Sequence, residues 1–410
     1  MSRSIWRSRI LPVIAAPLAL VLLITIWAVR PFCRIRIFMI PMRIGPLIVE
    51  AVSHAQEQSA LRGDGVWQVL LAYPEDQHRV NWTLVKHLGD GVWCGLLPKP
   101  LLVATWRLAV ILKCSKGIDA RTPVERYLHF WASKGNFVPD FDSQEQREVS
   151  RGFAELGISP GARVIAILTR DPAYFETFTQ NDEFIRRHEF RNCTIPNYEP
   201  ALRLAATLGF HSVRVGRASN NQIDTAVPGY SDYSISDQRS DLMDLALAQR
   251  SEFIVTCSSG LDSLYSLCGK PVVGVNLPWL DGKFAYHSLC LPKRMFAQID
   301  GRRVELPVIA VTSRRFQIGL NGPEWDGIPC ELVENSPTEI RETLELAIAI
   351  FDSPDLAARR RDMVLPLWDE FNRRVAGSNL HADARILTPS MPLPDCVINR
   401  FFSTEEISLR

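Results

Sequence analysis

The pattern of apolar and polar positions divides the chain into an apolar start followed by alternating strand-like and helix-like segments. Residues 10–29 are apolar except for Thr25. At a helical rise of about 1.5 Å per residue, a run of this length reaches about 30 Å, the thickness of the hydrocarbon layer of a bilayer. The pattern therefore predicts an N-terminal hydrophobic anchor helix, with residues 1–34 as a basic and hydrophobic membrane anchor.

Arginines flank this run on both sides, and no acidic residue precedes Glu50. The flanking residues are Arg3, Arg7, Arg9, Arg30, Arg34 and Arg36. A cleaved signal peptide is less favoured because no small-x-small cleavage site is present. A spanning anchor, a segment in the membrane interface and a buried helix all stay open, since Pro12 and Pro17 weaken a straight spanning helix. We expect association with the inner membrane and a catalytic body on the cytoplasmic side.

The segments after the anchor predict an α/β protein with two domains. Residues 35–150 begin with strand-like segments at 35–41 and 66–73 and a helix at 81–88, while 92–111 is apolar and ambiguous. From residue 151 the alternation is clearer. Strands are expected at residues 163–169, 212–216, 252–257 and 271–276, and helices at 197–208, 241–249 and 261–268. Strands separated by short helices indicate βαβ units and a parallel sheet.

Local signals predict where several helices begin and end. Asn197 is the expected N-cap of the helix at 197–208, and Gly209 follows its end. Ser336 and Glu339 form a capping box, and Pro366 should kink or divide the last long helix. We place the domain junction near residues 135–160. The expected domains are residues 35–150 and 151–335, with C-terminal helices and a tail at 336–410.

Composition narrows the function classes. A length of 410 residues suits two domains, and a formal net charge of +1 gives no sign of nucleic-acid binding. The nine cysteines are widely spaced without zinc-ligand spacing, which favours reduced, mostly buried thiols. No nucleotide-binding glycine motif of the dehydrogenase or P-loop type occurs. A D-x-D sequence at Asp140–Asp142 lies beside an expected capping box from Ser143 to Gln146, so we expect no metal site there.

The strand at 252–257 is followed directly by small residues and a helix. The candidates here are Ser258, Ser259, Gly260, Asp262 and Ser263. Serine and glycine allow a ligand close to the backbone, and free N–H groups at a helix start bind anions. The segment therefore suits the diphosphate of a nucleotide-sugar. An ordinary N-capped joint, with Ser258 or Ser259 as the cap, is the structural alternative.

A second candidate segment follows the strand at 163–169, where Arg170 and Asp171 reach the same sheet edge. The arginine guanidinium is permanently charged, and its N–H donors suit phosphate oxygens. Asp171 can orient the Arg170 side chain or accept a proton. A surface salt bridge is the structural alternative.

Other polar positions near the expected strand ends are Arg191, Asn192, Arg214, Gly216 and Asp237. Arg214 is equally compatible with a position on a strand face, paired with an acid. Asp241 begins a helix, where an acid is favourable whatever the function, so Asp237 is the better ligand candidate.

Taken together, these motifs resemble a family of bacterial glycosyltransferases of surface-polysaccharide assembly, best over residues 163–276. The matching motifs are Arg43-x-Gly45, Arg170-Asp171-x-x-Tyr174, His188-x-x-Arg191-Asn192, Asn197-Tyr198, Arg214-x-Gly216, Ser236-x-x-x-Ser240-Asp241-x-Met243-Asp244 and Ser259-Gly260-Leu261-Asp262. A looser similarity links the chain to fucosyltransferases of the GT-B class. There a histidine often precedes the arginine, whereas this chain has Leu168 in the corresponding strand.

The resemblance implies a GT-B fold, with two Rossmann-like domains facing a cleft and a nucleotide-sugar on the C-terminal one. The donor is a substrate, and no metal or other cofactor is implied. The diphosphate would bind Arg170 and the segment from Ser258 to Gly260, with Arg191 or Arg214 as a second cation and Asp262 or Ser263 near the ribose or sugar. Asp171 and Asp237 are the unranked candidates for a general base, and Arg43, Gly45 and Asn81 would line the acceptor side. A glycan or lipid-linked acceptor suits a membrane anchor, while a sugar-nucleotide epimerase and a non-catalytic carbohydrate-binding protein are the alternatives.

Overall fold

The computed structural model describes most of the C-terminal part of the chain and shorter pieces of the N-terminal part. The described residues are 14–29, 33–37, 48, 67–72, 81–87, 92–96, 98–112, 137–173, 185, 188–217, 220–223, 226–257, 259–278, 289–307, 316–319, 322–325, 327–377 and 393–401. The chain divides into two compact units, Met1–Asp140 and Phe141–Arg410.

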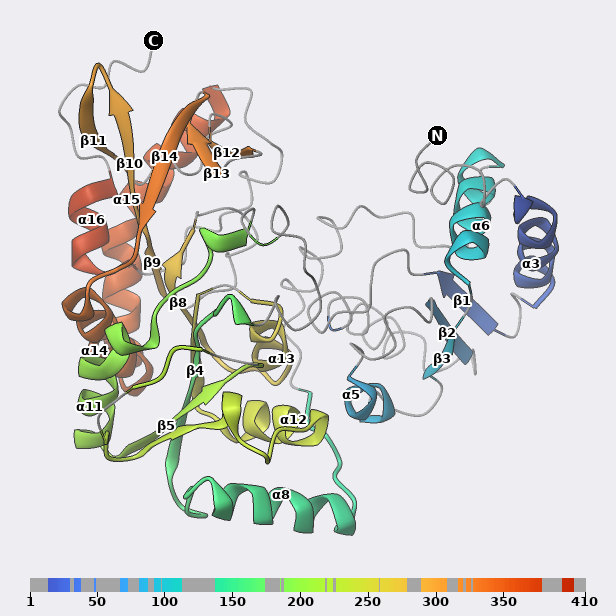
Figure 1. Cartoon of the computed structure of the whole chain (residues 1–410), viewed down its shortest axis with the longest axis horizontal. Coiled ribbons are helices and arrows are strands. Elements are labelled where there is room, and N and C mark those ends of the chain that lie inside the picture. Colours follow the sequence, from blue (N-terminus) through green and yellow to red (C-terminus); the bar gives the residue numbers. More distant parts are fainter. Residues whose placement is uncertain are drawn as a thin grey trace. The chain divides into compact units, whose positions relative to one another are not determined.

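The first unit contains a three-stranded parallel sheet with helices beside it. The strands β1 (Cys33–Ile37), β2 (Trp67–Ala72) and β3 (Val92–Leu96) lie in the order β1-β2-β3. The helices are α3 (Ala16–Val29), α5 (Trp82–His87) and α6 (Lys99–Ile111), and α3 packs along α6 (Figure 1). The ambiguous apolar segment therefore consists of a strand followed by a helix.

Helix α3 carries the apolar run, and much of its surface faces outward. Ala19, Leu23 and Ile26 are buried, whereas Leu18, Val21, Ile24 and Trp27 are more than half exposed. Among the described residues, no helix has both the length and the hydropathy needed to cross a bilayer.

A six-stranded parallel sheet forms the centre of the second unit. Its strands are β4 (Arg163–Leu168), β5 (Phe210–Val215), β6 (Tyr230–Asp232), β7 (Phe253–Thr256), β8 (Val272–Leu277) and β9 (Leu289–Pro292). They lie in the order β6-β5-β4-β7-β8-β9, and every neighbouring pair is parallel. Numbered from β4, this is the order 3-2-1-4-5-6 of a doubly wound parallel sheet, whose topological switch point lies between β4 and β7.

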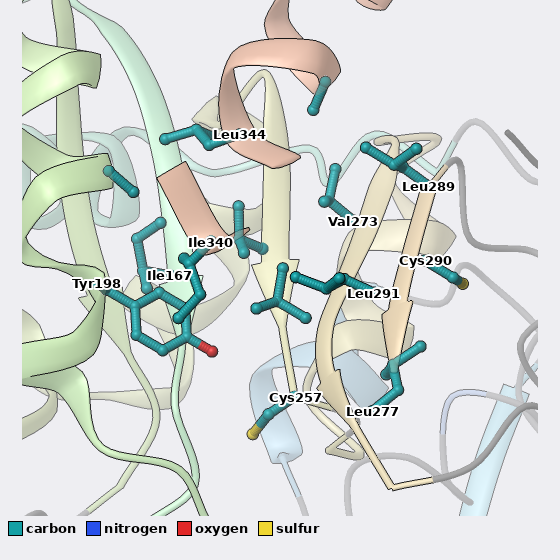
Figure 2. Packing of buried hydrophobic residues seen from close by; sticks show 14 of the residues in the cluster. Ile167, Tyr198, Cys257, Val273, Leu277, Leu289, Cys290, Leu291, Ile340 and Leu344 are labelled. Atoms are coloured by element: carbon teal, nitrogen blue, oxygen red, sulfur yellow. The ribbon is translucent and has the colours of Figure 1, made fainter. Parts of the chain in front are cut away.

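Helices cover both faces of this sheet, and the strands are therefore apolar on both sides. Every residue of β7 and β8 is buried. Helices α11 (Glu199–Thr207) and α14 (Pro337–Asp352) pack on one face and share its core (Figures 1 and 2). Helices α12 (Asp241–Arg250) and α13 (Asp262–Leu267) pack on the other, and α8 (Ser143–Glu155) contacts α12. Such strands appear in the sequence as continuous apolar runs. The alternation of these runs with helical segments is what predicted a parallel sheet.

A second sheet, which the sequence pattern did not predict, follows β9. It contains β10 (Arg294–Ile299), β11 (Arg302–Leu306), β12 (Phe316–Gly319), β13 (Gly322–Trp325) and β14 (Ile328–Val333) in the antiparallel order β11-β10-β14-β13-β12. Its strands mix charged and apolar residues, and Phe296 lies beneath the guanidinium groups of Arg294 and Arg303. This sheet connects β9 to α14.

Several predicted helix starts are wrong by one or two residues. Helix α8 is capped by Asp142 with Glu145 as its partner, one residue earlier than the expected box. Asn197 does not cap α11, because a 3-10 turn at Ile195–Tyr198 precedes that helix and the Asn197 amide binds Glu334 instead.

The C-terminal helices follow the sequence signals more closely. The box of Ser336 and Glu339 is confirmed at the start of α14. Helix α15 (Pro354–Gly377) continues through Pro366 without being divided. Ile340 and Leu344 of α14 and Val364 of α15 belong to the core cluster of the sheet, so these helices are part of the same compact unit.

Candidate functional site

The carboxyl ends of β4 and β7 hold the two predicted phosphate-binding segments next to each other. The N–H of Cys257, after β7, donates to the Leu168 carbonyl at 3.2 Å. The N–H of Arg170, after β4, donates to the Cys257 Sγ at 3.1 Å. Arg170 and the turn that begins at Cys257 are therefore bound to each other at the switch point, where open parallel sheets bind ligands.

A third segment, Arg191 to Thr194, joins this edge. The N–H of Cys193 donates to the Arg170 carbonyl at 3.1 Å. The Lys293 ammonium donates to the Asn192 carbonyl at 2.6 Å. Glu334 accepts hydrogen bonds from the N–H and hydroxyl of Thr194, so the segment is held from both sides. Arg191 and Asn192 thus lie beside Arg170, although Arg170 and Arg191 are 21 positions apart in the sequence.

The turn after β7 is built around a buried carboxylate. Asp262 Oδ2 accepts the Ser259 N–H at 3.1 Å and the Thr256 hydroxyl at 3.3 Å. Burial raises the pKa of Asp262 to about 6, although these hydrogen bonds and the nearby Arg191 charge lower it. Asp262 is 2% exposed, so its carboxylate stabilises the turn from the interior of the unit.

This geometry changes the expected roles within the turn. The N-cap of α13 is Leu261, without a side-chain cap, and the helix has six residues. The Ser259 N–H is used by Asp262, while the N–H groups of Gly260 and Leu261 donate to no residue that the structure describes. Gly260 is exposed and Ser263 is buried. Gly260 is thus the predicted turn residue best placed to meet a ligand.

The Asp171 carboxylate accepts hydrogen bonds from a neighbouring loop. It accepts the N–H of Ala173 at 3.0 Å, and the N–H and side-chain amide of Asn221 at 3.1 and 2.8 Å. Burial acts to raise the pKa of Asp171, but the backbone hydrogen bonds of Ala173, Asn221 and Asn220 outweigh it and hold that pKa below its usual value. A carboxylate stabilised in its charged form is a weak proton acceptor.

Arg214 lies inside the unit beside the same edge. Its side chain is 1% exposed and forms an ion pair with Asp232 at 3.1 Å. It also donates to the Thr169 hydroxyl at 3.0 Å and to the Asn221 carbonyl. Asp171 and Arg214 therefore bind the same loop residue, Asn221, and the structure supports the alternative in which Arg214 pairs with an acid.

The remaining predicted residues are distributed as follows. Asp237 is exposed in a turn after the edge strand β6, so β5 separates its strand from β4. Gly216 directly follows β5 with a φ of +122°, and a Cβ there would lie 3.2 Å from Leu168. Asn81 is buried and accepts the Leu84 N–H at 2.6 Å at the start of α5, which is a capping role. Arg43, Gly45 and Ser258 lie outside the described residues.

The sequence analysis missed Lys293, which is 5% exposed and contacts the Arg191–Thr194 segment. The sequence did contain a signal for this residue. Lys293 directly follows the apolar run Leu289-Cys-Leu-Pro292, which forms the parallel strand β9. The two thiols nearby, Cys193 and Cys257, are buried and free, as expected for reduced cysteines. Over the described ranges, no group of histidine, cysteine and acidic residues is arranged to hold a metal ion.

Comparisons with known proteins give distant structural similarities. No protein-family model matches the chain, and no curated relative matches its sequence. The fold is similar to ADP-heptose lipopolysaccharide heptosyltransferase II of E. coli, at 13% identity and a TM-score of 0.37, covering 59% of this chain and 84% of that one. It is also similar to a glycosyl transferase family 9 protein of Veillonella parvula (10% identity, 59% and 80% covered, TM-score 0.35). A third similar structure is the E. coli heptosyltransferase WaaC with ADP (10%, 60% and 87%, TM-score 0.33).

Proposed function

We propose that this protein is a metal-independent glycosyltransferase that moves a sugar from a nucleotide-sugar to a glycan or lipid-linked acceptor. One observation carries the proposal. Arg170 and the turn from Cys257 to Asp262 meet at the switch point of a 3-2-1-4-5-6 parallel sheet, joined by the hydrogen bond from Arg170 to Cys257. A permanent cation beside the exposed Gly260 backbone suits a diphosphate leaving group.

In this proposal the residues at the edge stabilise charge that develops as the glycosidic bond to the diphosphate breaks. Arg170 and Arg191 supply the guanidinium groups, and the Gly260 backbone approaches the phosphate. Such preorganised donors are typically worth about 3–4 kcal/mol each in the transition state. Asp171 acts as a positioning residue through the loop at Asn221, and Asp237 stays the candidate for the general base. An acceptor side formed by the first unit, with Arg43 and Gly45, is part of the proposal.

A screen of ligands against the full-length chain tests the donor. We expect one nucleoside diphosphate or its sugar derivative to raise the melting temperature, because a ligand that binds only the folded state stabilises it by RT ln(1 + [L]/Kd). At 100 times Kd this is about 2.7 kcal/mol. Product analysis then separates the alternatives: transfer to water or an acceptor supports the transferase, whereas an isomerised donor would indicate an epimerase. A flat response to every nucleotide would contradict both.

We also propose that the acceptor is presented at the cytoplasmic face of the inner membrane. Support comes from the outward-facing apolar side chains of α3, including Leu18, Val21 and Trp27, and from the flanking arginines. Exposed apolar surface beside basic residues favours anionic lipid. We expect the full-length chain to co-sediment with anionic vesicles and a variant lacking residues 1–34 to stay in solution. Equal sedimentation of the two would rule out this role for the segment.

A further inference from the structure

The end of β9 carries a buried lysine with a single described acceptor. The Lys293 N–H donates to the Leu277 carbonyl at 2.8 Å, which fixes where the side chain begins. Its ammonium donates to the Asn192 carbonyl at 2.6 Å, which fixes where it ends. An ammonium has three N–H donors. Among the described residues it uses one of them, although Lys293 is 5% exposed.

The ammonium lies near the same thiol that contacts Arg170. Cys257 Sγ accepts the Arg170 N–H at 3.1 Å. The hydrogen bond with Cys193 lowers the pKa of Cys257, burial opposes it, and the charges of both Arg170 and Lys293 lower it further. Arg170, which follows β4, and Lys293, which follows β9, therefore both act on the buried Cys257 sulfur at the switch point.

We infer that Lys293 is a buried positioning cation of the donor site, which holds the Asn192 backbone in place and adds the charge that favours a diphosphate over a monophosphate. The inference rests on the proposed function. A buried ammonium is costly unless an opposite charge compensates it, and the Asn192 carbonyl is neutral. An uncharged side chain of the same length would fill the space without this cost. The second phosphate group of a diphosphate, bound at the β4–β7 edge, supplies the missing compensation.

Lys293 can act on a bound ligand without contacting it directly. Its charge is a compact point on a flexible stem, and charge interactions are stronger inside a protein than in water. In this inference the lysine acts chiefly on the second phosphate group, which a monophosphate lacks. A structural anchor of Asn192 would instead affect all ligands of the site to the same extent.

The test compares Lys293→Met with Lys293→Arg in the full-length chain. Lys270→Met is the matched control, because Lys270 precedes β8 and thus lies at the opposite end of the sheet. Calorimetric Kd values are measured for pyrophosphate, for the tightest binder among ADP, GDP, UDP and CDP, and for its monophosphate. We expect Lys293→Met to weaken pyrophosphate and the diphosphate at least tenfold and the monophosphate at most threefold. Lys293→Arg and Lys270→Met should stay within threefold of the wild type.

The outcomes separate this inference from the transferase proposal. If the wild type binds none of these probes, the donor site itself is wrong and the inference falls with it. If the wild type binds but Lys293→Met weakens monophosphate and diphosphate equally, or neither, only the role of Lys293 is refuted. Should Lys293→Met fail to fold, Lys293→Gln decides instead, because its amide can still donate to the Asn192 carbonyl without a charge.

Discussion

Replacing Arg170 with alanine is expected to lower donor turnover at least about a hundredfold while leaving the protein folded. In the proposed mechanism, the loss follows from removing the guanidinium that stabilises the leaving diphosphate. The fold should survive because two hydrogen bonds at the switch point are made by the Arg170 backbone, whose N–H donates to Cys257 Sγ and whose carbonyl accepts the Cys193 N–H. An alanine at this position can still form both of these hydrogen bonds. Release of nucleoside diphosphate from the donor found by the ligand screen measures the effect.

Arg203→Ala is the matched control for this experiment. Arg203 lies on α11, is 45% exposed and pairs with Glu199 at 2.8 Å, so its loss should leave turnover within twofold of the wild type. Circular dichroism and the melting temperature verify that both variants are folded. If the Arg170→Ala variant turns over the donor at the wild-type rate, Arg170 has no part in the mechanism. The proposed leaving-group stabilisation would then lack its main cation.

Local sequence signals were sufficient to predict the central sheet. The apolar runs from Arg163 and Phe253 are buried on both faces, and each is bounded by glycine or polar residues, so both their period and their limits are visible in the sequence. Parallel pairing then places their ends at one edge. That Arg170 and Cys257 meet there follows from β4 and β7 being neighbours, which the expected βαβ order allowed but did not require.

The second sheet was missed because its strands carry weak signals. Strand β10 includes the polar residues Arg294 and Gln298, and β12 and β13 have four residues each. Short strands with charged positions resemble loops when only local pattern is used. Their stability comes from packing Met295 and Ala297 into the core, which depends on residues far away in the sequence.

The roles of individual site residues depended on partners that no local motif contains. Lys293 and Asn192 are 101 residues apart in the sequence, and Asp171 and Asn221 are 50 apart. Sequence spacing placed Asp171 at the correct edge, but only the hydrogen bonds show that a loop occupies its carboxylate. In contrast, Arg170 was identifiable because it follows a buried strand directly and its position needs no tertiary information.

Arg214→Met is expected to reduce the free energy of unfolding by about 3–5 kcal/mol, because it leaves a largely buried carboxylate without its partner. Asp232 is 13% exposed and would lose its ion pair with the 1% exposed Arg214 side chain. In the double variant Arg214→Met, Asp232→Asn, the charge is removed with its partner, while the amide oxygen still accepts the Ser234 N–H. We therefore expect the double variant to be less destabilised than Arg214→Met alone. Urea unfolding followed by circular dichroism measures both.

The same variants separate a structural role for Arg214 from a phosphate-binding one. If Arg214 acts only by pairing with Asp232, the double variant should bind the nucleoside diphosphate within about threefold of the wild type under conditions where it is folded, a change well below the tenfold that 1.4 kcal/mol produces. A direct phosphate ligand would lose its bond in both variants, and diphosphate affinity would then fall far more than monophosphate affinity. That result, together with a small change in unfolding free energy, would return Arg214 to the donor site beside Arg170.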